Sequence, residues 1–309
     1  MNGPDPVGID SPRPAVIPGL DGQPAFSLHL PDEPPPVLIA VPHAGRYYPP
    51  ALTARMRLPR VAKLRLEDRL VDLVAHAVAR ETGAALLVAH APRAMIDLNR
   101  GPADMDWDMV TGLPPGERPI QPSSTRARGG LGLIPRRLSG TGEIWRGPLP
   151  AGEVEARLEM VHRPYHQALS ETLAKLRKQW GAALLLDLHS MPPLPVREDG
   201  GRTLCVIGDR FRAAAGAELS AAAISHLQDA GYRTAHNRPY AGGYVLDRHG
   251  QPTRGIHALQ LELCRSLYLD ENLREPGPGL TAITTVIAGL IRRLAAELAS
   301  VPEQRLAAE

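Results

Sequence analysis

Two histidines in this sequence follow apolar runs, at positions that suit metal ligands. His43 lies in the segment Pro-His-Ala-Gly after the apolar residues 36–41, where small neighbours leave room for an ion. His189 stands two residues after Asp187 at the end of AALLLDLHS, and residues two apart on a strand share a face. Because imidazole is the commonest metal ligand, we expect Asp187 or His189 to bind a metal while the other orients a neighbour. Without a metal, His43 would be a capping or solvated loop residue, and Asp187 would be held by backbone amides.

Two adjacent carboxylates could complete this metal site. Glu67 and Asp68 lie near the start of a predicted helix, about 100° apart, so only one should face the ion. Their alternative role is to interact with the helix dipole. Zinc hydrolases commonly use two histidines and one carboxylate and leave one position for water. We therefore expect Zn²⁺ to be bound by His43, His189 and Asp68, with Glu67 as the alternative carboxylate.

Glu262 is the candidate for the group that moves protons. It lies between two leucines in the apolar run IHALQLELC. Burial of a carboxylate raises its pKa, and a general base near neutral pH needs a raised pKa. The alternative role is a structural ion pair with an arginine.

Several arginines could recognise an anionic substrate. Arg100 follows Asn99 just past an apolar run, and a guanidinium can bind a carboxylate through two hydrogen bonds. The glycine-rich segment GGLGLIPR could bring Arg136 to a ligand, but it lacks the lysine of a phosphate-binding P-loop. The loop 248–258 is either an anion-binding loop or a basic turn. The residues expected to contact a substrate are Asn99, Arg100, Arg93, Arg136, Ser190 and Arg254.

Regular elements must bring these side chains together. Apolar runs predict buried strands, and apolar residues at helical spacing predict helices between them. This alternation predicts one α/β domain with a mixed, mostly parallel sheet flanked by helices on both faces, and a ligand outside the carboxyl ends of the strands. We expect strands near 36–41, 84–92, 182–190, 203–209, 232–235 and 256–264, and helices near 60–82, 151–180, 211–230 and 279–299.

The ends of the chain differ in composition from its middle. Residues 1–34 are rich in Pro, Gly and Asp and are expected to form an extended arm, with a short strand near Ala25 to Leu30. Residues 35–300 should form the catalytic domain, and 301–309 a tail. Residues 101–150 hold many glycines and prolines, and an irregular stretch of that length is often functional.

Composition excludes several classes of function. The net charge of +2 gives no sign of a nucleic-acid or membrane partner, and no apolar stretch is long enough to span a bilayer. The N-terminal residues lack the basic and apolar parts of a secretory signal. The two cysteines, Cys205 and Cys264, are expected to be buried thiols in a reducing compartment. We therefore expect a cytoplasmic protein with a small-molecule partner; its oligomeric state is not predicted.

Taken together, the segments resemble the N-formylglutamate amidohydrolase family over about residues 36–275. The set DLHS, Asn99-Arg100 and Glu262 is also similar to the site of zinc carboxypeptidases, which implies a phosphorylase/hydrolase-like, zinc carboxypeptidase-like fold. The matching segments, in order, are PHAGRYYP, LEDRLVDLV, RAMIDLNR, GLGLIPR, PYHQAL, DLHSMP, GGY followed by RHG, and HALQLELCRSLYLDE. The segment LEDRLVD and the loop 101–130 depart from the family pattern, which leaves the carboxylate ligand and the substrate side chain open.

The resemblance implies a zinc-dependent amidohydrolase that converts N-formyl-L-glutamate to formate and L-glutamate, a reaction of histidine degradation. Glu262 would act as the base, and Arg93 or Arg136 would help to stabilise the oxyanion. Arg100 and Asn99 would hold the α-carboxylate, and Arg136 or Arg254 the side-chain carboxylate. The alternatives are a carboxypeptidase-like hydrolase of another N-acyl amino acid or small peptide, and a non-catalytic carboxylate-binding relative.

Overall fold

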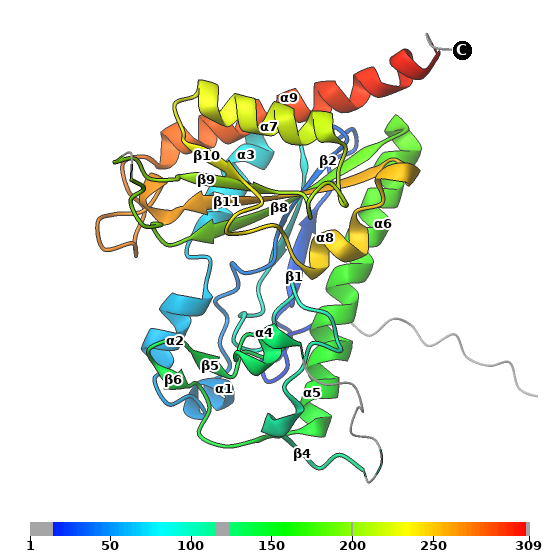
Figure 1. Cartoon of the computed structure of the whole chain (residues 1–309). Coiled ribbons are helices and arrows are strands. Elements are labelled where there is room, and N and C mark those ends of the chain that lie inside the picture. Colours follow the sequence, from blue (N-terminus) through cyan, green and yellow to red (C-terminus); the bar gives the residue numbers. More distant parts are fainter. Residues whose placement is uncertain (1–14, 115, 117–123, 199, 307–309) are drawn as a thin grey trace, which may run out of the picture.

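A central mixed sheet organises the part of the chain that this computed structural model describes, residues 15–114, 116, 124–198 and 200–306 (Figure 1). Within those residues the sheet has seven strands in the order β1-β3-β2-β8-β11-β9-β10. They are β1 Phe26–His29, β2 Val37–Val41, β3 Ala85–Ala89, β8 Ala183–Met191, β9 Cys205–Gly208, β10 Thr234–His236 and β11 Ile256–Cys264. Strands β3, β2, β8 and β11 run parallel, so their carboxyl ends meet at one edge. Strand β1 is antiparallel to β3, and β9 to β11, which confirms the mixed, mostly parallel sheet.

Helices cover both faces of the sheet, as the alternation of elements predicts (Figure 1). One face carries α3 Val71–Thr82, α7 Ala217–Asp229 and α9 Leu280–Leu306, and the other carries α6 Arg163–Trp180 and α8 Tyr244–His249. Two buried apolar clusters, one on each face, fill the space between the helices and the sheet. Among the described helices, none is apolar over a stretch that could cross a bilayer.

The side chains of β8 explain how one strand serves both core and site. Alternate residues point to opposite faces, and Leu184, Leu186 and Leu188 enter the cluster beneath α3, α7 and α9. The other face of β8 carries Ala183 and Leu185 on the side of α6. The same row continues with polar residues toward the carboxyl end of the strand, so the strand is apolar where it is enclosed and polar where the sheet ends.

Short elements form a second region on the α6 side of the sheet, in the lower part of Figure 1. The described residues between 101 and 150 are mainly irregular, as their composition predicts. The elements of this region are α1 Pro50–Ala54, α2 Pro59–Leu66, α4 Thr125–Arg128, α5 Ala151–Arg157, β4 Val110–Thr111, β5 Arg137–Leu138, β6 Gly142–Glu143 and β7 Leu149–Pro150.

The single helix predicted over 60–82 is wrong. Helix α2 ends at Leu66, α3 begins at Val71, and Leu70 between them has a φ of 56°. The backbone N–H of Asp68 in this break donates to the carbonyl of His43 at 2.9 Å. This tertiary contact overrides the local helical preference. The break in the helix turns Glu67 and Asp68 toward the interior.

The helix predicted over 151–180 contains a π-helical turn. This turn, Leu158–His162, joins α5 to α6. Pro164, the second residue of α6, has no N–H to donate to a carbonyl one turn earlier, so the widened turn accommodates it. The predicted helix 211–230 is shorter, α7, and α8 was not predicted because it has only six residues.

The two ends are only partly described. Residues 26–29 of the expected arm form edge strand β1, close to the short strand that the sequence predicts. Helix α9 continues to Leu306, beyond its expected end. Residues 1–14 of the predicted arm and the last residues, 307–309, lie outside the described residues, so the domain limits stay a prediction.

Candidate metal centre and substrate cavity

The register between β8 and β11 places four polar side chains together. Glu262 lies opposite His189, and Gln260 opposite Asp187. Residues two apart on a strand share a face, and paired residues of neighbouring parallel strands point the same way. The two strands therefore present an acid, an amide and an acid–imidazole pair to the α6 side of the sheet, near its carboxyl edge.

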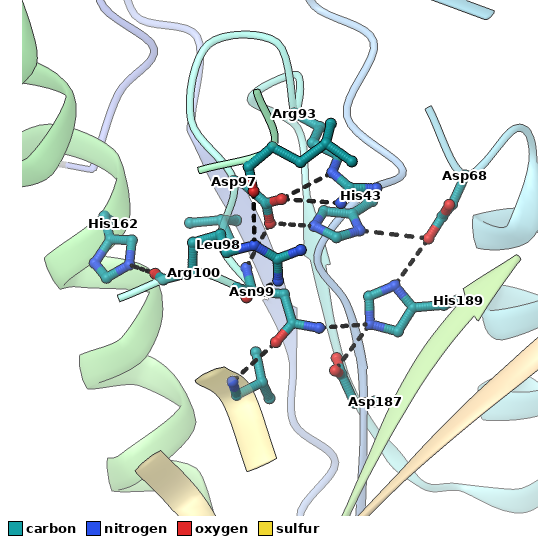
Figure 2. Close-up of polar contacts among 12 residues, drawn as sticks. His43, Asp68, Arg93, Asp97, Leu98, Asn99, Arg100, His162, Asp187 and His189 are labelled. Carbon is teal, nitrogen blue, oxygen red and sulfur yellow. Dashed lines mark hydrogen bonds and ion pairs between the residues drawn. The ribbon is translucent and has the colours of Figure 1, made fainter. Parts of the chain in front are cut away.

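His43, Asp68 and His189 converge on one point (Figure 2). One side-chain ligand atom from each lies within 4.8 Å of the others. Asp68 Oδ2 is 3.5 Å from His43 Nδ1 and 2.9 Å from His189 Nδ1. All three residues are buried. The turn after β2 makes this approach possible, because a side chain at Gly45 would overlap the carbonyl oxygen of Ala91.

The remaining nitrogen of each imidazole is held by another carboxylate. His43 Nε2 donates to Asp97 Oδ1 at 2.7 Å, and His189 Nε2 donates to Asp187 Oδ2 at 2.8 Å. These contacts turn both Nδ1 atoms toward Asp68. His43 Nδ1 is buried and has no hydrogen-bond partner among the described residues. Around a protein-bound metal, a ligating imidazole usually binds the ion through one nitrogen and donates the N–H of the other to a carboxylate.

The donor set fits a divalent cation. Buried carboxylates surround the two imidazoles, and a cation would relieve the repulsion between the lone pairs of Asp68 and His43. Burial opposes ionisation of Asp68, but the hydrogen bond from His189 and the nearby charges of His189 and His43 outweigh it and lower its pKa. Burial lowers the pKa of His189, but the charge of Asp187 and the hydrogen bonds to Asp187 and Asp68 raise it well above its usual value. Positive charge is therefore favoured at this point, whether from a proton or an ion.

Glu262 lies in the same cavity with an altered acidity. Burial raises its pKa to about 7, with a further increase from the charges of Asp68 and Asp187. His189 and Arg93 act in the opposite direction. Gln260 Nε2 donates to Glu262 Oε1 at 3.0 Å and fixes the carboxylate. A carboxylate of this acidity can accept and return a proton near neutral pH.

Asp97 connects the candidate metal centre to the residues expected to bind substrate, and it was not predicted from the sequence. It is fully buried, and it accepts hydrogen bonds from His43, from Arg93 Nε at 2.9 Å and from the backbone N–H of Asn99 at 2.9 Å. Its position two residues before Asn99-Arg100 was the available signal, because a buried carboxylate needs several partners.

Asn99 and Arg100 lie at the wall of the cavity in fixed orientations. Asn99 Oδ1 accepts from the N–H of Val245 at the start of α8, and its Nδ2 donates to Gln260. Arg100 donates from Nε to the carbonyl of Leu131 and from one terminal nitrogen to the carbonyl of Asn99. Burial lowers the pKa of Arg100, and a buried guanidinium of this kind gains from an anionic partner.

The cavity itself has a volume of about 460 Å³ and contains most of the predicted site residues. His43, Asp68, Arg93, Asn99, Arg100, His189, Ser190 and Glu262 all line it. Three lining arginines were not predicted, namely Arg65, Arg126 and Arg265. Arg265 donates to Ser190 Oγ at 3.1 Å and lies 3.7 Å from Asp68 Oδ1. Arg126 forms no ion pair or hydrogen bond through its guanidinium within the described part of the chain, and its charge lowers the pKa of Arg100.

Three predicted residues lie elsewhere. The carboxylate of Glu67 is near Arg69 at 3.4 Å, so Asp68 and not Glu67 meets the imidazoles. Arg136 is paired with Asp106 and Glu143 and does not line the cavity. Arg254, in a turn beside β11, bonds to Gln251 and lines a different, smaller cavity. Sequence spacing could not show that Arg136 and Arg254 lie outside the cavity, because the position of each depends on how an irregular loop folds.

A family model described as N-formylglutamate amidohydrolase matches residues 35–269. The chain belongs to the N-formylglutamate amidohydrolase family. Within this family, the N-formylglutamate deformylase of Pseudomonas aeruginosa is 32% identical over 248 residues, which cover 76% of this chain and 83% of that protein. The deformylase of Pseudomonas putida is 33% identical over 248 residues, 76% of this chain and 82% of that protein.

A solved structure of this amidohydrolase family has the same fold. The N-formylglutamate amidohydrolase from Ralstonia eutropha JMP134 superposes with a TM-score of 0.79 at 31% identity, covering 89% of this chain and 98% of that one. The family and the α/β fold implied by the sequence resemblance are therefore confirmed, and the chain is an amidohydrolase.

Proposed function

We propose that this protein is a zinc-dependent hydrolase that converts N-formyl-L-glutamate to formate and L-glutamate. The observation that carries the proposal is the buried group of His43, Asp68 and His189 beside Glu262, in a cavity lined by arginines. The named activity of the two Pseudomonas relatives supports the substrate. A role in histidine degradation accords with it.

Zinc is the ion that we infer for the site. Two imidazole nitrogens and one carboxylate oxygen, with an open side facing a cavity, are typical of catalytic zinc. A zinc ion held there would lower the pKa of a water molecule and polarise the formyl carbonyl. His43, Asp68 and His189 would hold the ion, and Asp97 and Asp187 would keep the two imidazoles aimed at it.

The chain supplies the proton transfers and the charge stabilisation. Glu262 takes a proton from the water that attacks the formyl carbon, because its raised pKa suits a base near neutrality. It then donates that proton to the nitrogen of L-glutamate as the carbon–nitrogen bond breaks. Arg93, held by Asp97 at the cavity wall, stabilises the negative charge that develops on the carbonyl oxygen.

The substrate carboxylates would be bound by different arginines. Arg100 and Asn99 hold the α-carboxylate, supported by their fixed orientation at the cavity wall. Arg126 is our candidate for the side-chain carboxylate, because it lines the cavity next to Arg100, whereas Arg136 and Arg254 do not. Two neighbouring guanidiniums repel each other, and a dicarboxylate between them would relieve that repulsion.

Removal of the metal tests the whole proposal. The purified protein should release formate from N-formyl-L-glutamate, lose that activity in a chelator and regain it with one equivalent of Zn²⁺. Elemental analysis before and after chelation provides the stoichiometry. Full activity in metal-free protein would contradict the proposed role of zinc.

Parallel assays separate the alternative substrates. N-formyl-, N-acetyl- and N-succinyl-L-glutamate and a dipeptide with a free carboxylate should be compared under the same conditions. A higher kcat/KM for any compound other than the formyl one would assign the site to another N-acyl amino acid or to a peptide. Zinc binding without turnover of any of them would indicate a non-catalytic carboxylate-binding relative.

We also propose that the protein acts in the cytoplasm on a small-molecule substrate. Cys205 and Cys264 are both buried free thiols, which accords with a reducing compartment. Fractionation of the native source, followed by the deformylase assay, would locate the activity.

A further inference from the structure

Three buried histidines lie behind the segment that is proposed to bind the α-carboxylate, outside the metal centre. His162 and His166 come from the end of the π-helical turn and the start of α6, and His249 from the end of α8. Their exposed fractions are 1%, 0% and 4%. The imidazole rings of His166 and His249 are nearly parallel, at 14°, with centroids 5.3 Å apart, and the centroids of His162 and His166 are 4.4 Å apart. The mechanism proposed above uses none of them.

Two of these imidazoles bind the backbone on either side of Asn99. His162 Nε2 lies 2.8 Å from the carbonyl oxygen of Arg100 (Figure 2), and His166 Nε2 lies 3.0 Å from that of Leu98. Residues four apart in a helix project from the same side, so the spacing of the two histidines matches two carbonyls separated by one residue. Asn99 is held between them.

The hydrogen bonds fix which nitrogen of each ring carries the proton. A carbonyl oxygen only accepts, so Nε2 of His162 and of His166 must donate. His166 Nδ1 then accepts from His249 Nε2 at 3.0 Å, and His249 Nδ1 faces the hydroxyl of Ser170 at 3.4 Å. The series of hydrogen bonds from Ser170 through His249 and His166 to Leu98 is thus complete with both imidazoles neutral. Burial also lowers the pKa of all three histidines, that of His249 to about 3.

Helix α8 closes the other side of the same segment. The N–H of Val245 in its first turn donates to Asn99 Oδ1 at 3.0 Å, and its last residue is His249. A side chain at Gly243 would come within 2.6 Å of Asn99 Oδ1, so glycine permits the close approach. The backbone of Leu98–Arg100 and the side chain of Asn99 are therefore held from α6 and from α8 at the same time.

We propose that His162 and His166, with His249 setting the proton arrangement of His166, are positioning residues that hold the Leu98–Arg100 backbone and thereby aim Asn99 and Arg100 at the α-carboxylate of the substrate. The inference rests on the proposed function of Asn99 and Arg100. None of the three histidines lines the substrate cavity. His162 and His166 act by fixing the carbonyls of Leu98 and Arg100, on either side of Asn99.

The test compares His162→Leu and His166→Leu with His162→Gln and His166→Gln. Leucine removes the donor and keeps much of the volume, whereas the terminal amide nitrogen of glutamine can replace Nε2. His226→Leu is a matched control, because His226 Nε2 makes the same kind of bond to the carbonyl of Val286 at 2.9 Å, between α7 and α9 on the other face of the sheet. Each variant is measured for kcat, KM, melting temperature and zinc content.

The leucine variants should raise KM for N-formyl-L-glutamate about tenfold or more and change kcat less than about threefold. An unpaired buried carbonyl should displace Asn99 and Arg100 but leave Glu262 in place. Zinc content should be unchanged. The glutamine variants should recover most of the KM. His226→Leu should lower the melting temperature and leave KM unchanged, because a smaller folded fraction reduces only the apparent kcat.

Binding of L-glutamate by calorimetry gives a readout that is independent of turnover. Its Kd should rise in parallel with KM in the leucine variants and recover in the glutamine variants. An unchanged Kd and KM in both folded leucine variants would overturn the inference, as would a failure of both glutamine variants to restore either constant. If a leucine variant does not fold, its glutamine counterpart and the other pair decide by the same criteria. Wild-type protein that binds L-glutamate without hydrolysing the formyl compound would contradict the proposed function but not the positioning role.

Discussion

Carboxylates around the two imidazoles determine what each residue of the candidate site can do. Asp97 and Asp187 bind the Nε2 atoms of His43 and His189, so both Nδ1 atoms face Asp68. Tautomer and ring orientation are thereby set before any ion arrives. Burial, with a further contribution from the charges of Asp68 and Asp187, raises the pKa of Glu262 to about 7.

Glu262→Gln should lower kcat by about a thousandfold or more, because the amide can neither accept nor return the proton. Zinc content should stay near that of the wild type, since Glu262 is not among the three converging ligand residues. Glu67→Gln is the control, because Glu67 is also buried but contacts Arg69 instead of the imidazoles. Steady-state kinetics with elemental analysis check both, and a Glu262→Gln enzyme of normal kcat would exclude this residue as the base.

Arg126→Ala should reduce discrimination between charged and neutral substrates. We expect kcat/KM for N-formyl-L-glutamate to fall about tenfold or more, and that for N-formyl-L-glutamine to change little, because only the first offers a second carboxylate. Arg128→Ala, on the same short helix but outside the cavity lining, is the matched control. Equal losses for both substrates would argue against a contact between Arg126 and the side-chain carboxylate.

Individual site residues could be predicted from the sequence where a regular element determines their direction. His189, Asp187 and Glu262 belong to strands whose period and register place them together. Arg126 and Asp97 could not be predicted in this way, because their positions depend on irregular segments. Arg136 and Arg254 were chosen for charge alone, and charge does not determine which way a loop folds.

At the scale of elements, two interruptions of helices bring side chains to the site. The break between α2 and α3 turns Asp68 toward His43, and the π-helical turn before α6 carries His162. Helical periodicity continues through both interruptions in the sequence, so it predicts one helix where the structure has two. Tertiary contacts decide such cases, and local propensity does not.

The buried histidines of α6 and α8 should make stability depend on pH. The pKa of His249 is about 3 in the folded protein and about 6.5 for an ordinary histidine. The folded state thus binds fewer protons than the unfolded chain between these values, so stability is fully present above pH 6.5 and declines as the pH falls toward 3. Denaturant unfolding of the wild type and of His249→Leu at pH 8, 6.5 and 5 should show a smaller decline in the variant. Equal declines would contradict a neutral buried His249.

At the scale of the whole molecule, the site is assembled from segments far apart in the chain. His43 follows β2, Asp68 precedes α3 and His189 ends β8. The order of strands in the sheet could be predicted only as mixed and mostly parallel, because periodicity identifies strands and not their neighbours. The antiparallel pairing of β9 with β11 carried no signal in the sequence.

A bound ion that joins these segments should stabilise the fold. Ligands that bind only the folded state raise the melting temperature, so chelation should lower it by several degrees, on the order of 2–4 °C per kcal/mol for a chain of this size. Calorimetric scans with and without chelator provide the measurement, and His189→Ala should lose the difference. A melting temperature indifferent to Zn²⁺ in the wild type would count against a metal at this place.

The carboxyl group of Asp97 should couple the binding of the metal ion to the binding of the substrate. It accepts from His43 on one side and from Arg93 and the Asn99 backbone on the other. The carboxylate charge of Asp97 therefore interacts with both His43 and Arg93. Binding of a cation at His43 or of an anion at Arg93 changes the strength of its hydrogen bond to the other residue. By thermodynamic linkage, whatever factor the organic anion imposes on cation affinity, the cation must impose on anion affinity.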